Sequence, residues 1–122
     1  MTTYGPYTPV RKAGNLLFVS GQVGINPSTK TAQADIADQT RQAIQNLELA
    51  LKEVNAELGD VVKTTLFLTD MNDFAAVNTI CEQVFPAPRP ARSTVGVNSL
   101  PRIAGETPLL IEIDAVAYKA VA

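Results

Sequence analysis

The stretch that decides the fold is residues 35–69, DIADQTRQAIQNLELALKEVNAELGDVVKTTLFLT. Asp35 is a residue type that caps helices, and apolar residues recur behind it at spacings of three and four: Ile36, Ala43, Ile44, Leu47, Leu51, Val54 and Leu58. This single apolar stripe predicts a long helix, with Gly59 as the residue that follows its end. Residues 61–69 are rich in Val, Thr, Leu and Phe with partial alternation, which predicts a strand directly after the helix.

Further elements follow on both sides of this stretch. Residues 10–13 and 16–20 flank the turn signal Gly14-Asn15 and predict a hairpin, after which residues 20–30 are expected to form a loop. Capping residues at 70–73 precede a second helix over residues 74–85, which a run of three prolines ends. Residues 93–98 and 109–118 are predicted strands, and a loop over 100–108 separates them.

The order of elements predicts one α+β domain over residues 1–122, with both helices on one face of a mixed sheet. In the last strand, alternate residues from Leu109 face one way, whereas Leu110, Glu112, Asp114 and Val116 face the other. The second set mixes carboxylates with aliphatic side chains. We therefore expect another subunit to cover part of that sheet face.

The composition excludes several classes of site. The chain has 122 residues, 10 Lys plus Arg, 12 Asp plus Glu, one Cys and no His. Without His there is no Ser-His-Asp triad and no His-ligated zinc, and one Cys excludes an intrachain disulfide. A sequence pI near 5.0 argues against nucleic acid as a partner. The start of the chain lacks a signal-peptide pattern and no apolar run is long enough to span a membrane, so we expect a cytoplasmic protein.

Four residues are candidates for chemistry, each with a structural alternative. Asn78 lies in the apolar stripe of the second helix, where it either bonds internally or points into a pocket. Arg92 begins a strand and is either a surface residue or a partner for a carboxylate. Asp114, in partly apolar surroundings, is either a proton acceptor that holds water or one half of an ion pair, and Glu112 on the same face could play either part. Cys81 is interpreted as a small core residue.

Several segments together resemble the reactive intermediate deaminase (RidA/YjgF) family. They occur in family order over the whole chain and are specific in combination: Gly5-Pro6-Tyr7, Val19-Ser20-Gly21-Gln22, Asp60-Val61-Val62-Lys63-Thr64-Thr65, Asn72-Asp73-Phe74 with Val77-Asn78, Pro90-Ala91-Arg92-Ser93, and Ile111-Glu112-Ile113-Asp114-Ala115. The resemblance implies a chorismate-mutase-like fold and a homotrimer with clefts between subunits. It also implies hydrolysis of enamines and imines such as 2-aminoacrylate to 2-oxo acids and ammonia, without a metal or organic cofactor.

The resemblance also implies roles for single residues. Arg92 is expected to bind the substrate carboxylate, and Asp114, in place of the family's usual Glu, is expected to position the attacking water. The family's cleft tyrosine falls on Tyr7, which we group with Arg92 and Asp114 as catalytic. The substrate-binding positions of the family fall on Ser20, Gly21, Asn78 and Thr94. The loop over residues 102–108 looks longer than in the type members.

Three functions are therefore considered. The first is a cofactor-independent imine and enamine deaminase that acts on small 2-imino acids. The second is a non-catalytic trimer that binds a small carboxylate or a protein partner. The third is a ribonuclease or translation inhibitor, an activity also attributed to the family, which the acidic pI and the lack of His disfavour.

Overall fold

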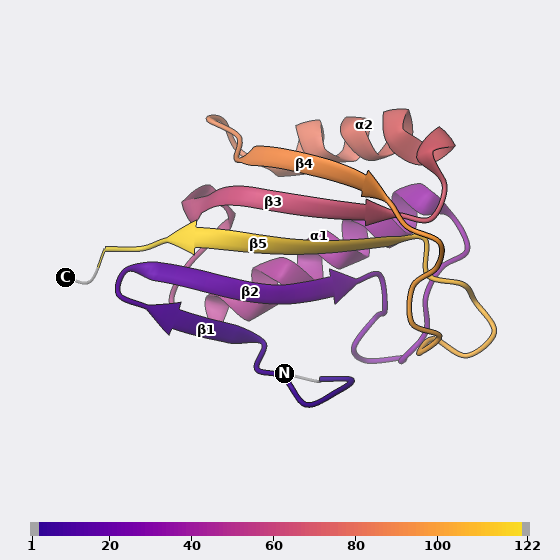
Figure 1. Ribbon diagram of the computed structural model, residues 1–122, viewed down its shortest axis with the longest axis horizontal. Coiled ribbons are helices and arrows are strands. Elements are labelled where there is room, and N and C mark those ends of the chain that lie inside the picture. The colour runs from indigo at the N-terminus through magenta and orange to yellow at the C-terminus, as the bar shows by residue number, and fades with distance from the viewer. Residues whose placement is uncertain (1–2, 121–122) are drawn as a thin grey trace.

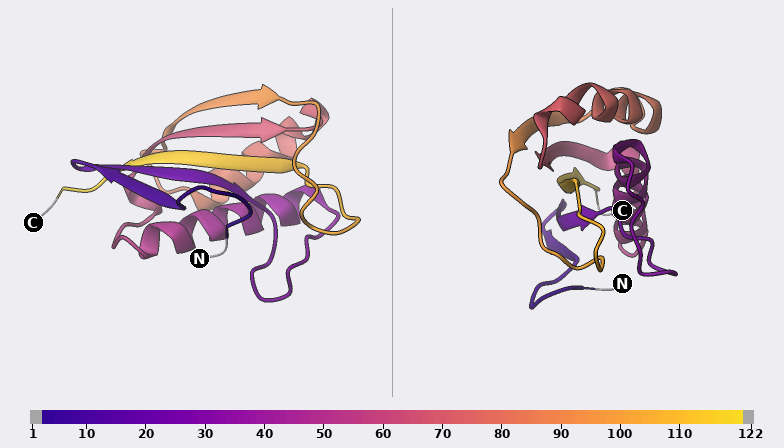
Figure 2. Two further views of the ribbon diagram at one scale, coloured as in Figure 1. Left: turned by 60° about the horizontal axis from the view of Figure 1, so that its bottom comes forward. Right: turned by 90° about the vertical axis from the view of Figure 1, so that its right-hand side faces the viewer.

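Two helices cover one face of a five-stranded sheet, as the order of predicted elements indicated (Figures 1 and 2). The computed structural model describes residues 3–120. The elements are β1 (Val10–Ala13), β2 (Leu16–Val23), α1 (Ile36–Lys52), β3 (Val61–Leu68), α2 (Phe74–Val84), β4 (Ala91–Gly96) and β5 (Ile111–Tyr118), with short 3-10 turns at Leu58–Asp60 and Met71–Asp73.

The last strand lies in the middle of the sheet, whose order is β1-β2-β5-β3-β4. The pairs β1–β2, β2–β5 and β3–β5 are antiparallel, whereas β3 and β4 are parallel. Helix α2 connects the parallel pair, because parallel neighbours need a crossover rather than a tight turn. The mixed sheet of the sequence-based prediction is confirmed.

Helix α1 starts where the sequence predicts but ends earlier. The Asp35 carboxylate accepts a hydrogen bond from the backbone N–H of Asp38 at 3.2 Å. The helix ends at Lys52, so the prediction that it continues to Leu58, with Gly59 directly after its end, is wrong. Asn55 takes the left-handed conformation (φ 61°) that ends the helix, and the N–H of Ala56 bonds back to the Leu51 carbonyl at 2.9 Å. Asn is the residue after Gly that adopts this conformation most readily, which explains the early end.

The core lies between the sheet and the helices. On β5 the residues Ile111, Ile113, Ala115 and Ala117 are buried against α1 and α2, and the intervening side chains from Glu112 to Val116 are half-buried on the other face. The predicted alternation of this strand is confirmed. Because both helices lie on one side, no helix of the described residues covers the other sheet face (Figure 2).

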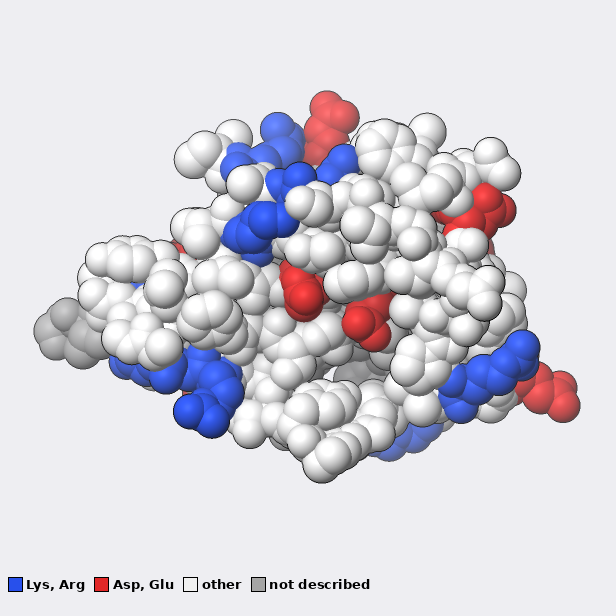
Figure 3. Space-filling view, in the orientation of Figure 1, with Lys and Arg blue, Asp and Glu red and all other residues white. Residues whose placement is uncertain are grey.

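The uncovered sheet face is mostly uncharged and carries exposed apolar side chains. Phe18 and Val116 are paired across β2 and β5, as are Leu16 and Tyr118. Phe18 is 45% exposed and Tyr118 is 50% exposed. Figure 3 shows this face, with a broad white surface, acidic groups near its centre and most basic groups at its rim.

Strand boundaries differ from the predictions at three places. β2 continues to Val23, where a loop was predicted from residue 20, and its ladder with β5 shifts between Val19 and Gln22. β4 begins at Ala91, two residues before the predicted start, and β5 begins at Ile111. Among residues 3–120, no helix is both long and apolar enough to cross a membrane.

Candidate active site

The site begins at a bulge in β2, where the strand loses one of its neighbours. β1 pairs with β2 only as far as Val10 opposite Val19, and the N–H of Ser20 still bonds to the Pro9 carbonyl at 2.9 Å; beyond Ser20 the strand pairs with β5 alone. Ser20 and Gly21 together lie opposite the single residue Asp114, because Val19 pairs with Ala115 and Gln22 with Ile113. Such a bulge bends the strand and turns its side chains in new directions.

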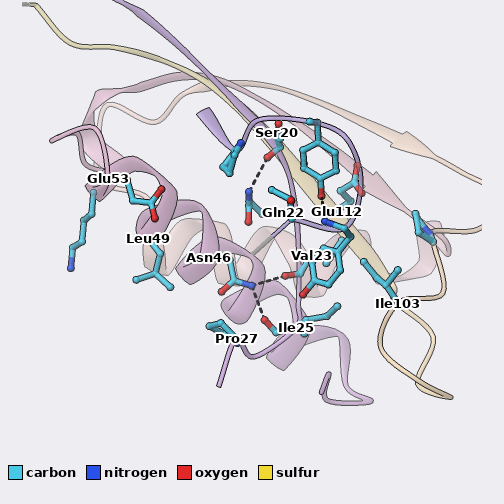
Figure 4. A pocket seen from close by; sticks show the side chains of 17 residues that line it. Ser20, Gln22, Val23, Ile25, Pro27, Asn46, Leu49, Glu53, Ile103 and Glu112 are labelled. Atoms are coloured by element: carbon cyan, nitrogen blue, oxygen red, sulfur yellow. Dashed lines mark hydrogen bonds between the residues drawn. The ribbon is translucent and has the colours of Figure 1, made fainter. Parts of the chain in front are cut away.

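A cavity of about 750 Å³ opens at this edge (Figure 4). It is bounded by the N-terminal segment, the free edge of β2, the exposed side of α1 and the loop before β5. Its lining includes Tyr4, Tyr7, Ser20, Gly21, Ile25, Asn46, Leu49, Glu53, Ile103 and Glu112. The walls are largely apolar with a few polar groups, which is the usual character of a small-molecule site.

Glu112 supplies a carboxylate to this cavity. Burial raises its pKa above the usual value for Glu, and the neighbouring carboxylate of Asp114 raises it further. A Cβ built on Gly21 would lie 2.5 Å from Oε2 of Glu112, so the carboxylate packs directly against the glycine backbone. The bulge therefore places a half-buried acid with a raised pKa at the cavity wall, a combination found at functional sites.

Hydrogen bonds to the backbone fix the walls around this acid. On the α1 side, the Asn46 amide donates to the carbonyls of Val23 and Ile25, both at 2.8 Å (Figure 4). On the N-terminal side, the Ser20 hydroxyl donates to the Thr8 carbonyl at 2.6 Å. The Tyr7 hydroxyl accepts a hydrogen bond from the N–H of Tyr4 at 3.2 Å. The bonds of Ser20 and Tyr7 hold the segment before β1 at the edge of the cavity.

Arg92 lies at another place, on the edge strand β4. It pairs with the buried Thr64 and so faces the helix layer, with its guanidinium 5.5 Å from the centre of the Phe74 ring. It borders a recess of about 200 Å³ whose other lining residues are Thr64, Cys81, Phe85, Arg89 and Pro90. Thr94, two residues further along β4, points to the same side as Arg92.

Asn78 lies on α2 between Phe74 and Cys81, which are its neighbours at helical spacing. Its side-chain oxygen is buried and has no hydrogen-bond partner among residues 3–120. A buried amide oxygen without a partner is costly, so this oxygen lacks the internal bond of the structural alternative. Asn78 is absent from the linings of both cavities.

One chain thus carries two groups of predicted site residues that do not meet. Tyr7, Ser20 and Gly21 line the large cavity, whereas Arg92 borders the small recess. β3 and β5 separate β4 from β2, and neighbouring strands lie about 4.8 Å apart, so the two groups are well beyond contact. Arg92 also faces the helices, on the opposite sheet face from Glu112.

The acidic residue in the cavity differs from the one expected. Asp114, to which the resemblance assigned the water, pairs with Thr65 and is absent from the linings of both cavities. Glu112, which the strand pattern left as able to play either part, lines the large cavity instead. Alternation places both carboxylates on one face, and Glu112, which lies opposite Val23 beyond the bulge, is the one that borders the opening.

Within the described part of the chain, no group of three or more His, Cys, Asp or Glu is placed to hold a metal ion. The polar groups of the cavity are the carboxylates of Glu53 and Glu112, the ammonium of Lys52, hydroxyls, amides and backbone groups. This set can orient water, move a proton through Glu112 and bind small polar groups.

Comparisons with known proteins agree on the family. A family profile described as "Endoribonuclease L-PSP" matches residues 1–119. The chain is 41% identical over 118 residues to the 2-iminobutanoate/2-iminopropanoate deaminase of Escherichia coli K12, covering 94% of this chain and 88% of the relative. It is 45% identical over 116 residues to a RutC family protein of Pyrococcus horikoshii, covering 94% and 88% respectively.

Solved structures give the same result. The crystal structure of RidA from a Psychrobacter species matches with a TM-score of 0.90 and 31% identity, covering 97% of this chain and 92% of that one. The YjgF gene product of E. coli matches with a TM-score of 0.87 and 39% identity, covering 96% and 91%. The chain therefore belongs to the endoribonuclease L-PSP family, the family of the YjgF and RidA proteins.

Proposed function

We propose that this protein hydrolyses reactive 2-imino acids and their enamine tautomers to 2-oxo acids and ammonia. The observation that carries the proposal is the half-buried carboxylate of Glu112, with its raised pKa, at the wall of a largely apolar cavity. Relatives about 41% identical are named 2-iminobutanoate/2-iminopropanoate deaminase, which supports a deaminase-like enzyme.

The reaction needs little more than an oriented water and a proton relay. The enamine tautomerises to the imine, water adds to the imine carbon, and the C–N bond of the resulting carbinolamine breaks. Glu112 accepts a proton from the attacking water and returns it to the departing nitrogen, so that the products are a 2-oxo acid and ammonia. A carboxylate with a raised pKa suits both halves of this task, because it gains and loses a proton more evenly than an ordinary Glu.

Arg92 is the proposed partner of the substrate carboxylate, since a guanidinium matches both oxygens of that group. Within one chain it lies far from the cavity of Glu112, on the other side of the sheet. The proposed site is therefore completed by a second copy of the chain, in a homotrimer with clefts between subunits. The uncovered apolar sheet face supports such an assembly, because patches of this kind mark protein–protein contacts.

The remaining residues have supporting roles in this proposal. Tyr7, Ser20 and Gly21 shape the wall beside Glu112, and Asn78 and Thr94 accompany Arg92 on the other side of the cleft. Asp114 raises the pKa of Glu112. The role assigned to Asp114 from the sequence, holding the water itself, is the alternative that the test must separate.

The test follows pyruvate release from 2-aminoacrylate generated by a serine dehydratase in low-amine buffer. We expect the wild type to accelerate release and the Arg92→Ala and Glu112→Gln variants to lose about a hundredfold or more, with Asp114→Asn much less affected. Circular dichroism and light scattering confirm fold and assembly of each variant. Full activity of Arg92→Ala would refute the carboxylate-binding role, and loss in Asp114→Asn alone would return the water to Asp114.

No acceleration for any imino acid of a broad amino-acid oxidase panel would refute the deaminase. Saturable binding of 2-oxobutanoate without turnover would then identify a carboxylate-binding protein.

A further inference from the structure

The chain folds back on itself just before β1, so that Tyr7 packs against the residues that precede it. The N–H of Tyr7 donates to the carbonyl of Gly5 at 2.9 Å, which closes a three-residue turn around Pro6. A Cβ built on Gly5 would lie 3.3 Å from Cε2 of the Tyr7 ring, so the ring lies against the backbone of this glycine. The backbone N–H of Tyr4 donates to the Tyr7 hydroxyl at 3.2 Å. The turn therefore fixes both the ring and the oxygen at its end.

The Tyr7 hydroxyl keeps its hydrogen for another molecule. A tyrosine hydroxyl has one hydrogen to donate, and its oxygen accepts. The N–H of Tyr4 uses the oxygen as its acceptor, and no acceptor among residues 3–120 takes the hydrogen. Tyr7 is 46% exposed and lines the same cavity as Glu112. The cavity therefore has a free hydrogen-bond donor on the N-terminal segment as well as a carboxylate on β5.

The bond from Tyr4 also limits what this hydroxyl can do. A hydroxyl without a partner rotates to suit its surroundings and acts as a donor or as an acceptor. The hydrogen of Tyr7 cannot point at an N–H that already donates to the same oxygen, so it points elsewhere. The backbone of Tyr4 thus leaves Tyr7 as a donor of fixed position, which loses less freedom when a ligand binds.

We propose that the backbone N–H of Tyr4 is a positioning group for Tyr7, whose hydroxyl donates a hydrogen bond to the imine nitrogen of the substrate or to the oxygen that replaces it in the 2-oxo acid. This inference rests on the proposed function, in which the cavity holds that imine. The hydrogen bond draws electron density from the C=N bond and so favours the addition of water at carbon.

A proline substitution tests the N–H directly, because proline is the one residue that lacks it. Tyr4→Pro removes the donor, whereas Tyr4→Ala keeps the donor and removes the side chain. Comparing the two separates the N–H from the Tyr4 ring, which also lines the cavity. Each substitution is made in the wild type and in Tyr7→Phe, which keeps the ring and lacks the hydroxyl.

The experiment measures the Kd of the assembled protein for 2-oxobutanoate by calorimetry and kcat/KM for 2-aminoacrylate in the coupled assay, with Tm as a check of folding. We expect Tyr7→Phe to lower kcat/KM and to weaken binding about tenfold, and Tyr4→Pro to lose about fivefold more than Tyr4→Ala in both. In the Tyr7→Phe background Tyr4→Pro and Tyr4→Ala should be equal, because the N–H has lost its acceptor.

Gly5→Ala is a second variant that acts on the ring instead of the N–H. The added Cβ would press on the edge of the Tyr7 ring and shift it by a few tenths of an ångström. We expect it to lower kcat/KM in the wild type and to have no further effect in Tyr7→Phe, where there is no hydroxyl to displace. This arm decides the donor role of Tyr7 even where Tyr4→Pro does not fold.

Each outcome decides the proposal. A difference between Tyr4→Pro and Tyr4→Ala that disappears in Tyr7→Phe supports it. The same difference in both backgrounds shows that the proline acts on the course of the chain, and this overturns the role of the N–H, as do equal values in the wild type. Wild-type values in Tyr7→Phe, with turnover abolished in Glu112→Gln, overturn the donor and leave the proposed function intact. Binding of 2-oxobutanoate without turnover refutes the deaminase, while the Kd values still decide the hydrogen bond.

Discussion

Gly21 is a single residue on which the position of the proposed catalytic group, the Glu112 carboxylate, depends. We expect Gly21→Ala to lower turnover of 2-aminoacrylate by about a hundredfold, because the new Cβ would displace the carboxylate of Glu112. Tm should change little, since the displaced atoms are the end of a flexible side chain. Gly14→Ala is the control. The φ of 60° at Gly14 strains an Ala, but nothing lies within 4 Å of the added Cβ, so this variant should lower Tm and preserve turnover. Equal turnover in the two variants would contradict the prediction.

The raised pKa of Glu112 has a consequence for stability. The folded protein binds a proton at Glu112 more tightly than the unfolded chain does, because folding raises the pKa of this group. The contribution of Glu112 to stability is therefore favourable below its pKa in the unfolded chain, and it is lost as pH rises through its pKa in the folded protein. At pH 7 the ionised Glu112 therefore destabilises the fold. We expect Glu112→Gln to raise Tm by a few degrees at pH 7 while abolishing turnover, with the gain in Tm vanishing at pH 4.

The pH dependence of activity should also report the raised pKa of Glu112. Because the proposed reaction needs the ionised carboxylate, kcat/KM should fall on the acid side at a pH above that of an ordinary Glu. Asp114→Asn removes the second cause of the shift, so it should move this acid limb to lower pH. An acid limb that Asp114→Asn does not move would argue against Glu112 as the titrating group.

At the scale of elements, one side chain of α1 secures the loop that leads into β5. Gln39 is fully buried and makes three bonds: its amide nitrogen donates to the carbonyls of Gln33 and Pro108 at 2.8 and 3.0 Å, and its oxygen accepts from the N–H of Leu110 at 2.8 Å. Gln39→Leu leaves all three backbone groups without a partner. We expect a loss of about 3 kcal/mol in the free energy of unfolding, measured by urea denaturation.

The matched control for Gln39 is Gln45→Leu, which changes an exposed residue on the same helix. It should alter the free energy of unfolding by less than about 0.5 kcal/mol. A similar loss in both variants would mean that helix propensity or solubility, rather than the three buried bonds, determines the result.

Elements with strong local signals could be predicted from the sequence, and those set by tertiary contacts could not. The Asp35 cap and the alternation of β5 are local patterns, and both are confirmed. The predicted end of α1 was wrong because Asn55 adopts the left-handed conformation that ends the helix, whereas Gly59 is the residue type that adopts it most readily. The extension of β2 through Ser20 and Gly21 was missed because pairing with β5, about ninety residues away in sequence, holds a stretch that reads locally as a loop.

The same limit applies to the candidate site. Arg92 and Glu112 could each be singled out by residue type and position, but spacing does not say which sheet face or which copy of the chain they occupy. The choice between Glu112 and Asp114 depends on where the cavity opens along β5, which is set by segments distant in sequence and is contained in no local pattern. A glycine next to a serine within the strand, at Ser20-Gly21, was the one available signal, because glycine within a strand often marks a bulge.

For the whole molecule, the separation of the two groups of site residues gives a direct test of assembly. Arg92→Ala and Glu112→Gln should each be inactive alone. If a cleft takes Arg92 from one copy and Glu112 from another, chains of the two variants unfolded and refolded together at equal amounts should regain about a quarter of wild-type activity. The coupled assay measures the recovery. Mixtures that stay inactive although mass spectrometry detects hybrid oligomers would contradict a site shared between copies.

The bulge in β2 also bears on how such a protein arises. Removing three nucleotides from the gene, and with them either Ser20 or Gly21, would restore one-to-one pairing with β5. The shortened chain would form a continuous ladder, while Glu112 would lose the glycine against which it packs. An inserted codon at this place is therefore enough to supply the bulge against which Glu112 packs, and its loss is enough to remove it. A single mutational event would thus exchange the proposed catalytic arrangement for a regular strand ladder.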